Sequence, residues 1–127
     1  MNHQLFEKVL TSKALKRNLL VHVAVPTRID GPLKGIFFND GQNVWNDDQA
    51  SFNQSWGVGE AIDFNLHQIL VVSVSCADGM VRLDEYSKFV DNSDKFPADW
   101  ITRPVGGKAD LYLKEVVEVI IDRKSVV

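Results

Sequence analysis

Residues 69–75 read ILVVSVS, and this run is the clearest buried strand in the chain. Its apolar side chains occupy consecutive positions rather than alternate ones, which is typical of a strand covered on both faces. A second run of this kind, KGIFFN, begins at Lys34 and ends at Asn39. Sheets whose strands are buried on both faces are mostly parallel and belong to α/β proteins. The two runs therefore predict an α/β fold with a mostly parallel sheet.

An antiparallel hairpin is predicted upstream of these runs. Its first arm covers residues 5–10, its second arm covers residues 15–25, and residues 11–13 supply the turn. Between residues 19 and 25, apolar side chains recur at every second position, which is the period of a strand. Pro26 ends the second arm, because proline cannot donate a hydrogen bond to a ladder.

Helices are expected to flank the sheet. One begins near Trp56, with Ser55 as its cap. Another covers residues 108–122 and follows two glycines at residues 106–107. Residues 77–107 are predicted to be a long irregular loop, and loops of this length in a compact domain are usually functional. The predicted apolar stripe of the last helix consists of Leu113, Val116, Val117, Ile120 and Ile121.

Composition places the chain among ordinary globular proteins. It has 127 residues, 45% of them hydrophobic and 24% charged, and a net charge of -3, so we expect one domain. The basic residues form no face or stripe, which argues against a nucleic-acid partner. The apolar runs are too short to span a bilayer, and no signal peptide is recognisable. With a single cysteine, Cys76, and no leader, the expected compartment is the cytoplasm and no membrane partner is expected.

Polar residues follow both apolar strands. In open α/β sheets, ligands bind outside the carboxyl ends of the strands. The segments that follow the two strands, residues 39–45 and 76–86, are therefore the places to look for a site.

These segments carry a family resemblance. Residues 39–45, NDGQNVW, resemble the D-G-Q-N loop of an esterase family in the α/β-hydrolase superfamily, the family that includes esterase D and enterochelin-esterase-like proteins. Further motifs follow in the family's order along nearly the whole chain. They are WGVGEA at residues 56–61, VSV at 72–74, RLDEYS at 82–87, and the glycine pair at 106–107 followed by Tyr112.

The resemblance implies a partial α/β-hydrolase fold with strand order 1-2-4-3, in which residues 1–127 form a single truncated domain. Complete members of the family use a Ser-His-Asp triad on small ester substrates, without a cofactor. Their nucleophile stands in a G-x-S-x-G elbow on a strand after the last helix. This sequence contains no G-x-S-x-G. We therefore expect no catalytic residue in this chain.

Gly41 and Gln42 are the oxyanion-hole candidates. In α/β-hydrolases one donor to the reacting carbonyl oxygen is a backbone N–H from the loop after the third strand. The resemblance places Gly41 and Gln42 in that loop. The alternative is a tight turn that requires glycine at a positive φ.

A second set of residues is expected to shape a cleft. Arg82, Glu85 and Tyr86 have an equally plain structural reading, as an ion pair and a tyrosine that hold the long loop in place. The cleft-shaping candidates are Asp40, Asn43, Trp45, Arg82, Glu85 and Tyr86.

Other residue types give no site. The acidic residues Asp40, Asp47 and Asp48 do not have the spacing of a calcium loop, so no metal is expected. Cys76 is interpreted as a small apolar residue rather than a nucleophile. His22 and His67 are interpreted as structural or exposed.

Two functions remain open. The first is membership of a carboxylic-ester hydrolase family, in a form truncated before the catalytic serine. The second is a non-catalytic remnant or a small α/β binding domain. In either case the strand from Lys34 to Asn39 would present an apolar edge, through which the chain is expected to self-associate.

Overall fold

The computed structural model describes residues 2–91 and 100–121. This part of the chain divides into two compact units. The first consists of residues 2–10 and 18–76, and the second of residues 11–17 and 77–121, without residues 92–99. Each unit is described by itself.

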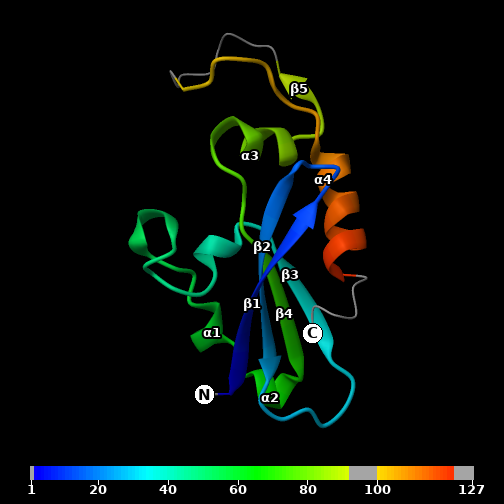
Figure 1. Cartoon of the computed structure of the whole chain (residues 1–127). Coiled ribbons are helices and arrows are strands. Elements are labelled where there is room, and N and C mark those ends of the chain that lie inside the picture. The colour runs from blue at the N-terminus through cyan, green and yellow to red at the C-terminus, as the bar shows by residue number, and fades with distance from the viewer. Residues whose placement is uncertain (1, 92–99, 122–127) are drawn as a thin grey trace. The chain divides into compact units, whose positions relative to one another are not determined.

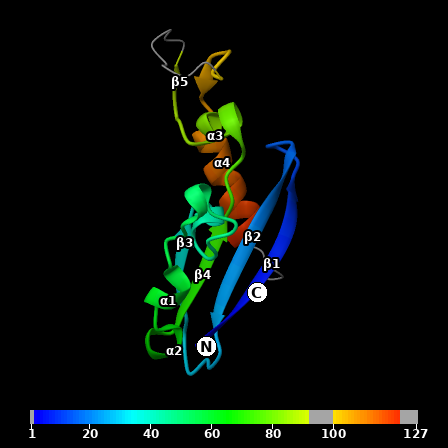
Figure 2. The same ribbon diagram turned by 90° about the vertical axis from the view of Figure 1, so that its left-hand side faces the viewer.

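A four-stranded sheet forms the first unit, and its two strands β1 and β2 run on into residues 11–17 of the second. The strand order is β1-β2-β4-β3, which agrees with the predicted order. Figures 1 and 2 show β1 and β3 at opposite edges of the sheet. The strands are β1 (His3–Ser12), β2 (Arg17–Pro26), β3 (Lys34–Phe38) and β4 (Ile69–Val74).

The predicted mostly parallel α/β sheet is wrong. Only β3 and β4 are parallel, with Ile36 paired to Val71. Strand β2 pairs with β4 in the antiparallel direction, with Val23 opposite Val72. Strands β1 and β2 form the expected hairpin and run in opposite directions (Figure 1). The sheet is therefore mixed and mostly antiparallel.

An apolar run gives information about the burial of a strand and not about the direction of its neighbours. Consecutive apolar residues indicate that both faces of a strand are covered, but they do not determine the direction of its neighbours. Strand β4 is central and well buried, with Val71 and Val74 fully inaccessible to solvent. That burial is compatible with one antiparallel and one parallel neighbour.

One face of the sheet is covered by the segment between β3 and β4. This segment contains the short helices η1 (Gly41–Asn43), η2 (Ser51–Asn53), α1 (Val58–Ala61) and α2 (Phe64–His67). The expected helix near Trp56 is thus a single turn that begins at Val58, after Gly57 in the left-handed conformation. The core on this face is built from Ala24, Val44, Trp45, Val58, Phe64 and Val71.

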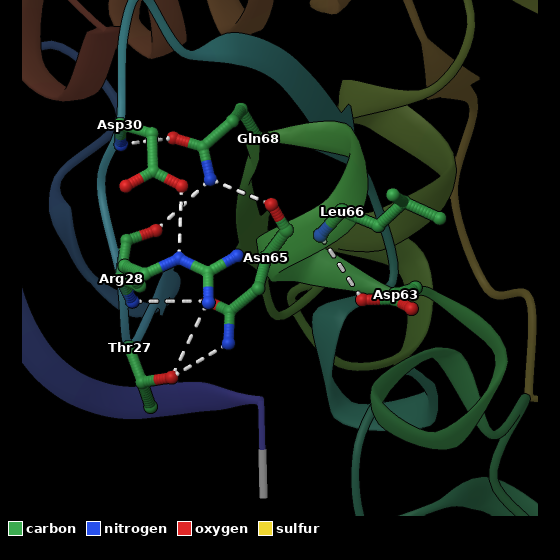
Figure 3. Close-up of polar contacts among 7 residues, drawn as sticks. All are labelled: Thr27, Arg28, Asp30, Asp63, Asn65, Leu66 and Gln68. Carbon is green, nitrogen blue, oxygen red and sulfur yellow. Dashed lines mark hydrogen bonds and ion pairs between the residues drawn. The ribbon is translucent and has the colours of Figure 1, made fainter.

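Polar contacts hold the β2–β3 connection against α2 (Figure 3). The Asn65 side chain accepts a hydrogen bond from the Arg28 backbone N–H at 2.9 Å. The Gln68 side chain accepts one from the Asp30 N–H at 2.7 Å and donates one to the Arg28 carbonyl at 2.9 Å. The Lys34 N–H then donates to the Gln68 carbonyl at 2.9 Å. These bonds set the point at which β3 joins β4.

The second unit combines the hairpin tip with two helices and a small antiparallel sheet. The Ser12 hydroxyl donates to a Glu115 carboxylate oxygen at 2.6 Å and accepts from the Leu15 N–H at 3.1 Å. The other elements are α3 (Gly79–Glu85), β5 (Val90–Asp91), β6 (Val105–Gly106), α4 (Ala109–Glu115) and the π-helical stretch η3 (Val116–Ile121).

Two sequence predictions fail in this unit. Helix α3 lies inside the stretch predicted to be irregular. The predicted stripe on the last helix is also wrong in part, because Leu113 and Val117 are 54% and 45% exposed. The side chains buried in this helix are Tyr112, Val116 and Ile120, and the predicted end at residue 122 lies outside the described residues.

No helix in the described part of the chain combines the length and the apolar character needed to cross a membrane.

Candidate functional site

The candidate site of the first unit is the turn after β3. Because β3 and β4 are parallel neighbours, their carboxyl ends lie side by side at the same end of the sheet. Gly41 lies in the turn after β3 and is buried against the end of β4. A Cβ atom at Gly41 would lie 2.8 Å from the Val74 carbonyl carbon and 2.9 Å from the Val74 nitrogen. The turn therefore lies so close to β4 that only glycine fits.

Asp40, rather than Gly41, takes the left-handed conformation, with φ 53° and ψ 46°. Gly41 is not among the glycines with positive φ, so the expected reason for a glycine here is replaced by the close approach to β4. Asn43 donates its N–H to the Asp40 carbonyl at 2.9 Å, and Val44 donates to the Gly41 carbonyl at 3.2 Å. Within the described residues, neither the Gly41 nor the Gln42 backbone N–H donates to a backbone or side-chain acceptor.

The Gln42 side chain fastens the turn to the residue after β4. Its Nε2 donates to the Cys76 Sγ at 3.1 Å, and its Oε1 accepts from the Cys76 backbone N–H at 3.0 Å. These two bonds join residues that are 34 positions apart in the sequence. The sequence predicts a role for the backbone of Gln42, and no sequence pattern points to this side-chain contact.

The rest of the loop is ordered by its own polar groups. The Trp45 indole N–H donates to the Ser73 hydroxyl at 2.9 Å, and both residues are buried. The Asn43 side-chain oxygen accepts a hydrogen bond from the Ser51 N–H at 2.8 Å. The Asn43 backbone carbonyl accepts one from the Trp56 N–H at 2.7 Å. Asp40, Asn43 and Trp45, three of the predicted cleft-shaping residues, thus lie in or beside one turn.

An open hollow of about 380 Å³ adjoins this loop and is lined by Asn43, residues 51 and 52, and residues 54–56. Two aromatic side chains at its rim are exposed, Phe52 to 99% and Trp56 to 53%. Phe52 also has a φ of 61°, a conformation that bulky side chains rarely adopt. Exposed aromatic surface of this kind is available to a ligand.

Arg82, Glu85 and Tyr86 belong to the second unit and have partners there. The Arg17 guanidinium binds the buried Glu85 carboxylate through two contacts, of 2.6 Å and 3.0 Å. The Arg82 guanidinium lies 4.9 Å from the centre of the Tyr86 ring, and Tyr86 meets Tyr112 edge to face with 5.5 Å between ring centres. Burial raises the pKa of Tyr112. Glu85 is thus ion-paired to Arg17 rather than to Arg82, and the cleft-shaping role of the three residues stays a prediction.

Asp84 is a buried carboxylate for which the sequence gives no local signal. Its carboxylate is 5% exposed and receives two hydrogen bonds from Arg103, at 2.7 Å and 3.1 Å, and one from the Gly106 N–H at 2.9 Å. The Arg103 hydrogen bonds hold the pKa of Asp84 below its usual range, against the opposing effect of burial. This carboxylate therefore ties α3 to the glycine pair that precedes α4.

Metal-binding groups are not gathered anywhere in the described part of the chain, where no three His, Cys, Asp or Glu residues could hold one ion. His22 is buried in β2, and its Nε2 lies 3.0 Å from a Glu7 carboxylate oxygen. Cys76 is partly buried, and its sulfur accepts a hydrogen bond from the Gln42 side chain.

No family model, no curated protein and no solved structure matches the chain. The function is therefore inferred from the geometry of the site.

Proposed function

We propose that this chain carries the carbonyl-binding half of a carboxylic-ester hydrolase site, formed by the turn after β3. The observation that carries the proposal is the pair of backbone N–H groups at Gly41 and Gln42, for which no acceptor is found in the described part of the chain. The turn that holds them is bound to β4 by the Gln42 side chain. The resemblance of residues 39–45 to an esterase loop points in the same direction.

The chemistry of this half-site is oxyanion stabilisation. Acyl transfer from an ester builds negative charge on the carbonyl oxygen, and fixed N–H donors stabilise that charge. Donors that are already held in place need little reorganisation when the charge develops. The close packing of Gly41 on β4 and the two Gln42–Cys76 bonds supply that rigidity.

Turnover is not assigned to this chain. An ester hydrolase of the Ser-His-Asp kind needs a nucleophile and a base as well as donors, and the sequence contains no G-x-S-x-G. The proposed role is therefore binding of a small ester or of its tetrahedral anion, without a cofactor.

The test is an NMR titration of the whole chain with the monoanion of a short alkyl phosphonate monoester, which has the shape and charge of the tetrahedral intermediate. We expect saturable shifts of the Gly41 and Gln42 amide signals. Gln42→Ala should weaken binding several-fold because it removes both bonds to Cys76. Gln49→Ala, at an exposed glutamine on the same loop that does not line the hollow, is the matched control and should leave binding unchanged. Amide signals at residues 41 and 42 that do not move would overturn the proposal.

A second candidate function is that of a small binding domain that uses the aromatic hollow. Phe52 and Trp56 are exposed at its rim, which favours an apolar ligand. The same titration separates the two functions, because shifts confined to residues 51–56 would favour the hollow over the turn.

A further inference from the structure

The outer edge of β3 has no partner strand in the described part of the chain. Strand β3 is last in the order β1-β2-β4-β3, so only its inner edge is paired. Its first three residues, up to Ile36, are exposed, and Ile36 is 37% exposed. An unpaired strand edge with apolar side chains is a template for pairing with another chain.

The register with β4 determines which backbone groups point outward. The Lys34 N–H donates inward, to the Gln68 carbonyl at 2.9 Å. Successive peptide groups of a strand alternate in direction, so Ile36 also faces β4, while the N–H and carbonyl groups of Gly35 and Phe37 face the open edge. Gly35 has open space around it, because a Cβ at this position would meet no atom within 4 Å.

We propose that two copies of this chain pair edge to edge through β3, antiparallel, about a twofold axis at Ile36. An isologous contact of this kind brings the same surface of both copies together and closes after two copies. It places Gly35 of each copy opposite Phe37 of the other. Both residues direct N–H and carbonyl groups outward, so each Gly35–Phe37 pair exchanges two hydrogen bonds.

Side chains at the two ends of β3 suit the same register. The two Ile36 side chains lie opposite each other across the axis, where pairing covers their exposed surface. Lys34 of each copy lies opposite Phe38 of the other. The two Lys34 residues lie at opposite ends of the ladder, so the like charges stay apart.

The test is the molar mass of the full chain, measured by size-exclusion chromatography with light scattering over a series of concentrations. We expect the mass to rise from 14.3 kDa to twice that value and then stop. Gly35→Pro removes one outward N–H and places its ring in open space, so it should stay monomeric. Gly35→Ala keeps the N–H and should dimerise like the parent. Circular dichroism and thermal melts confirm that both variants fold.

A charge exchange at the axis tests the register and does not depend on proline. Ile36→Lys and Ile36→Glu place two like charges opposite each other, so each should be monomeric alone. Mixed in equal amounts, the two variants should form a heterodimer. A parent chain that stays monomeric at every concentration would overturn the proposal. So would growth beyond a dimer, a Gly35→Pro dimer, or a mixture of the Ile36 variants that stays monomeric.

Discussion

Gly41 is constrained by the space around it rather than by its own dihedral angles. A side chain at this position would meet the backbone of Val74 and Ser75 at 2.8–3.0 Å, and backbone atoms in the centre of a sheet cannot easily move aside. The residue that does adopt a strained conformation is its neighbour Asp40. The turn can lie against β4 because Gly41 has no side chain and Asp40 adopts the left-handed conformation.

Gly41→Ala is predicted to lower the free energy of unfolding by about 1–3 kcal/mol, the usual cost of forcing extra atoms into a packed site. Urea denaturation followed by circular dichroism measures the change. The control is Gly31→Ala, because a Cβ at Gly31 meets no atom within 4 Å and its φ is not positive. A loss from Gly41→Ala no larger than that of the control would mean that the turn does not lie against β4.

Among the elements of the second unit, α3 is linked to strand β6 by one buried carboxylate. Asp84 receives hydrogen bonds from Arg103 and from the Gly106 N–H, while its own carbonyl accepts from the Lys108 N–H at 2.9 Å. Gly106 itself has a φ of 105°, and a Cβ there would overlap the Phe89 carbonyl oxygen. Helix α3, strand β6 and the start of α4 therefore depend on the same few residues.

Asp84→Asn is predicted to cost about 1–2 kcal/mol of unfolding free energy at pH 7. Hydrogen bonds to charged groups contribute about 1.5–3 kcal/mol, and the half-exposed Arg103 can return to water, which reduces the loss. The pKa of Asp84 is lowered in the folded state. Its contribution is therefore present above the unfolded pKa of about 3.9 and disappears as pH falls through the folded value.

Urea denaturation from pH 7 down to pH 3 measures this dependence. The parent chain should lose stability in acid more steeply than Asp84→Asn, and the two should converge at low pH. The control Asp48→Asn, at an exposed carboxylate, should change stability by less than about 0.5 kcal/mol. Parallel pH curves for the parent and Asp84→Asn would contradict the assignment.

At the scale of the whole molecule, the described chain joins a mixed sheet with its loop and a second unit of helices and a two-stranded sheet. The residues that resemble the esterase motifs fall into both units. The D-G-Q-N turn belongs to the first unit, and the R-x-x-E-Y-S segment belongs to α3 in the second.

The purified chain is predicted not to hydrolyse p-nitrophenyl acetate or butyrate above the rate in buffer. Donors alone leave only weak residual catalysis when the nucleophile and base are missing, and here the donor from the residue after the nucleophile is missing too. Release of p-nitrophenolate, followed by absorbance, measures the rate. An activity that survives purification and disappears in Cys76→Ala or His67→Ala would contradict this and would place the chemistry at that residue.

Local sequence patterns were enough to predict the four strands of the first unit and the turn after β3. The apolar runs predicted the positions of β3 and β4, the alternation predicted β2, and the glycine after β3 marked the turn, because strands and turns leave a local pattern in the sequence. The predicted burial of β3 on both faces is wrong, since Lys34, Gly35 and Ile36 are exposed. That pattern also predicted correctly that β3 and β4 end at the same edge.

Other features depend on contacts that form only in the folded chain. The direction of β2 against β4, the bonds between Gln42 and Cys76, and the burial of Asp84 depend on residues far apart in the chain. The last helix buries Tyr112, Val116 and Ile120 and leaves Leu113 exposed. The apolar residues of this helix are compatible with burial of several of its faces, and the surface against which the helix packs determines which face is buried. Contacts of this kind leave no local pattern, because both partners must be in place before either residue has its role.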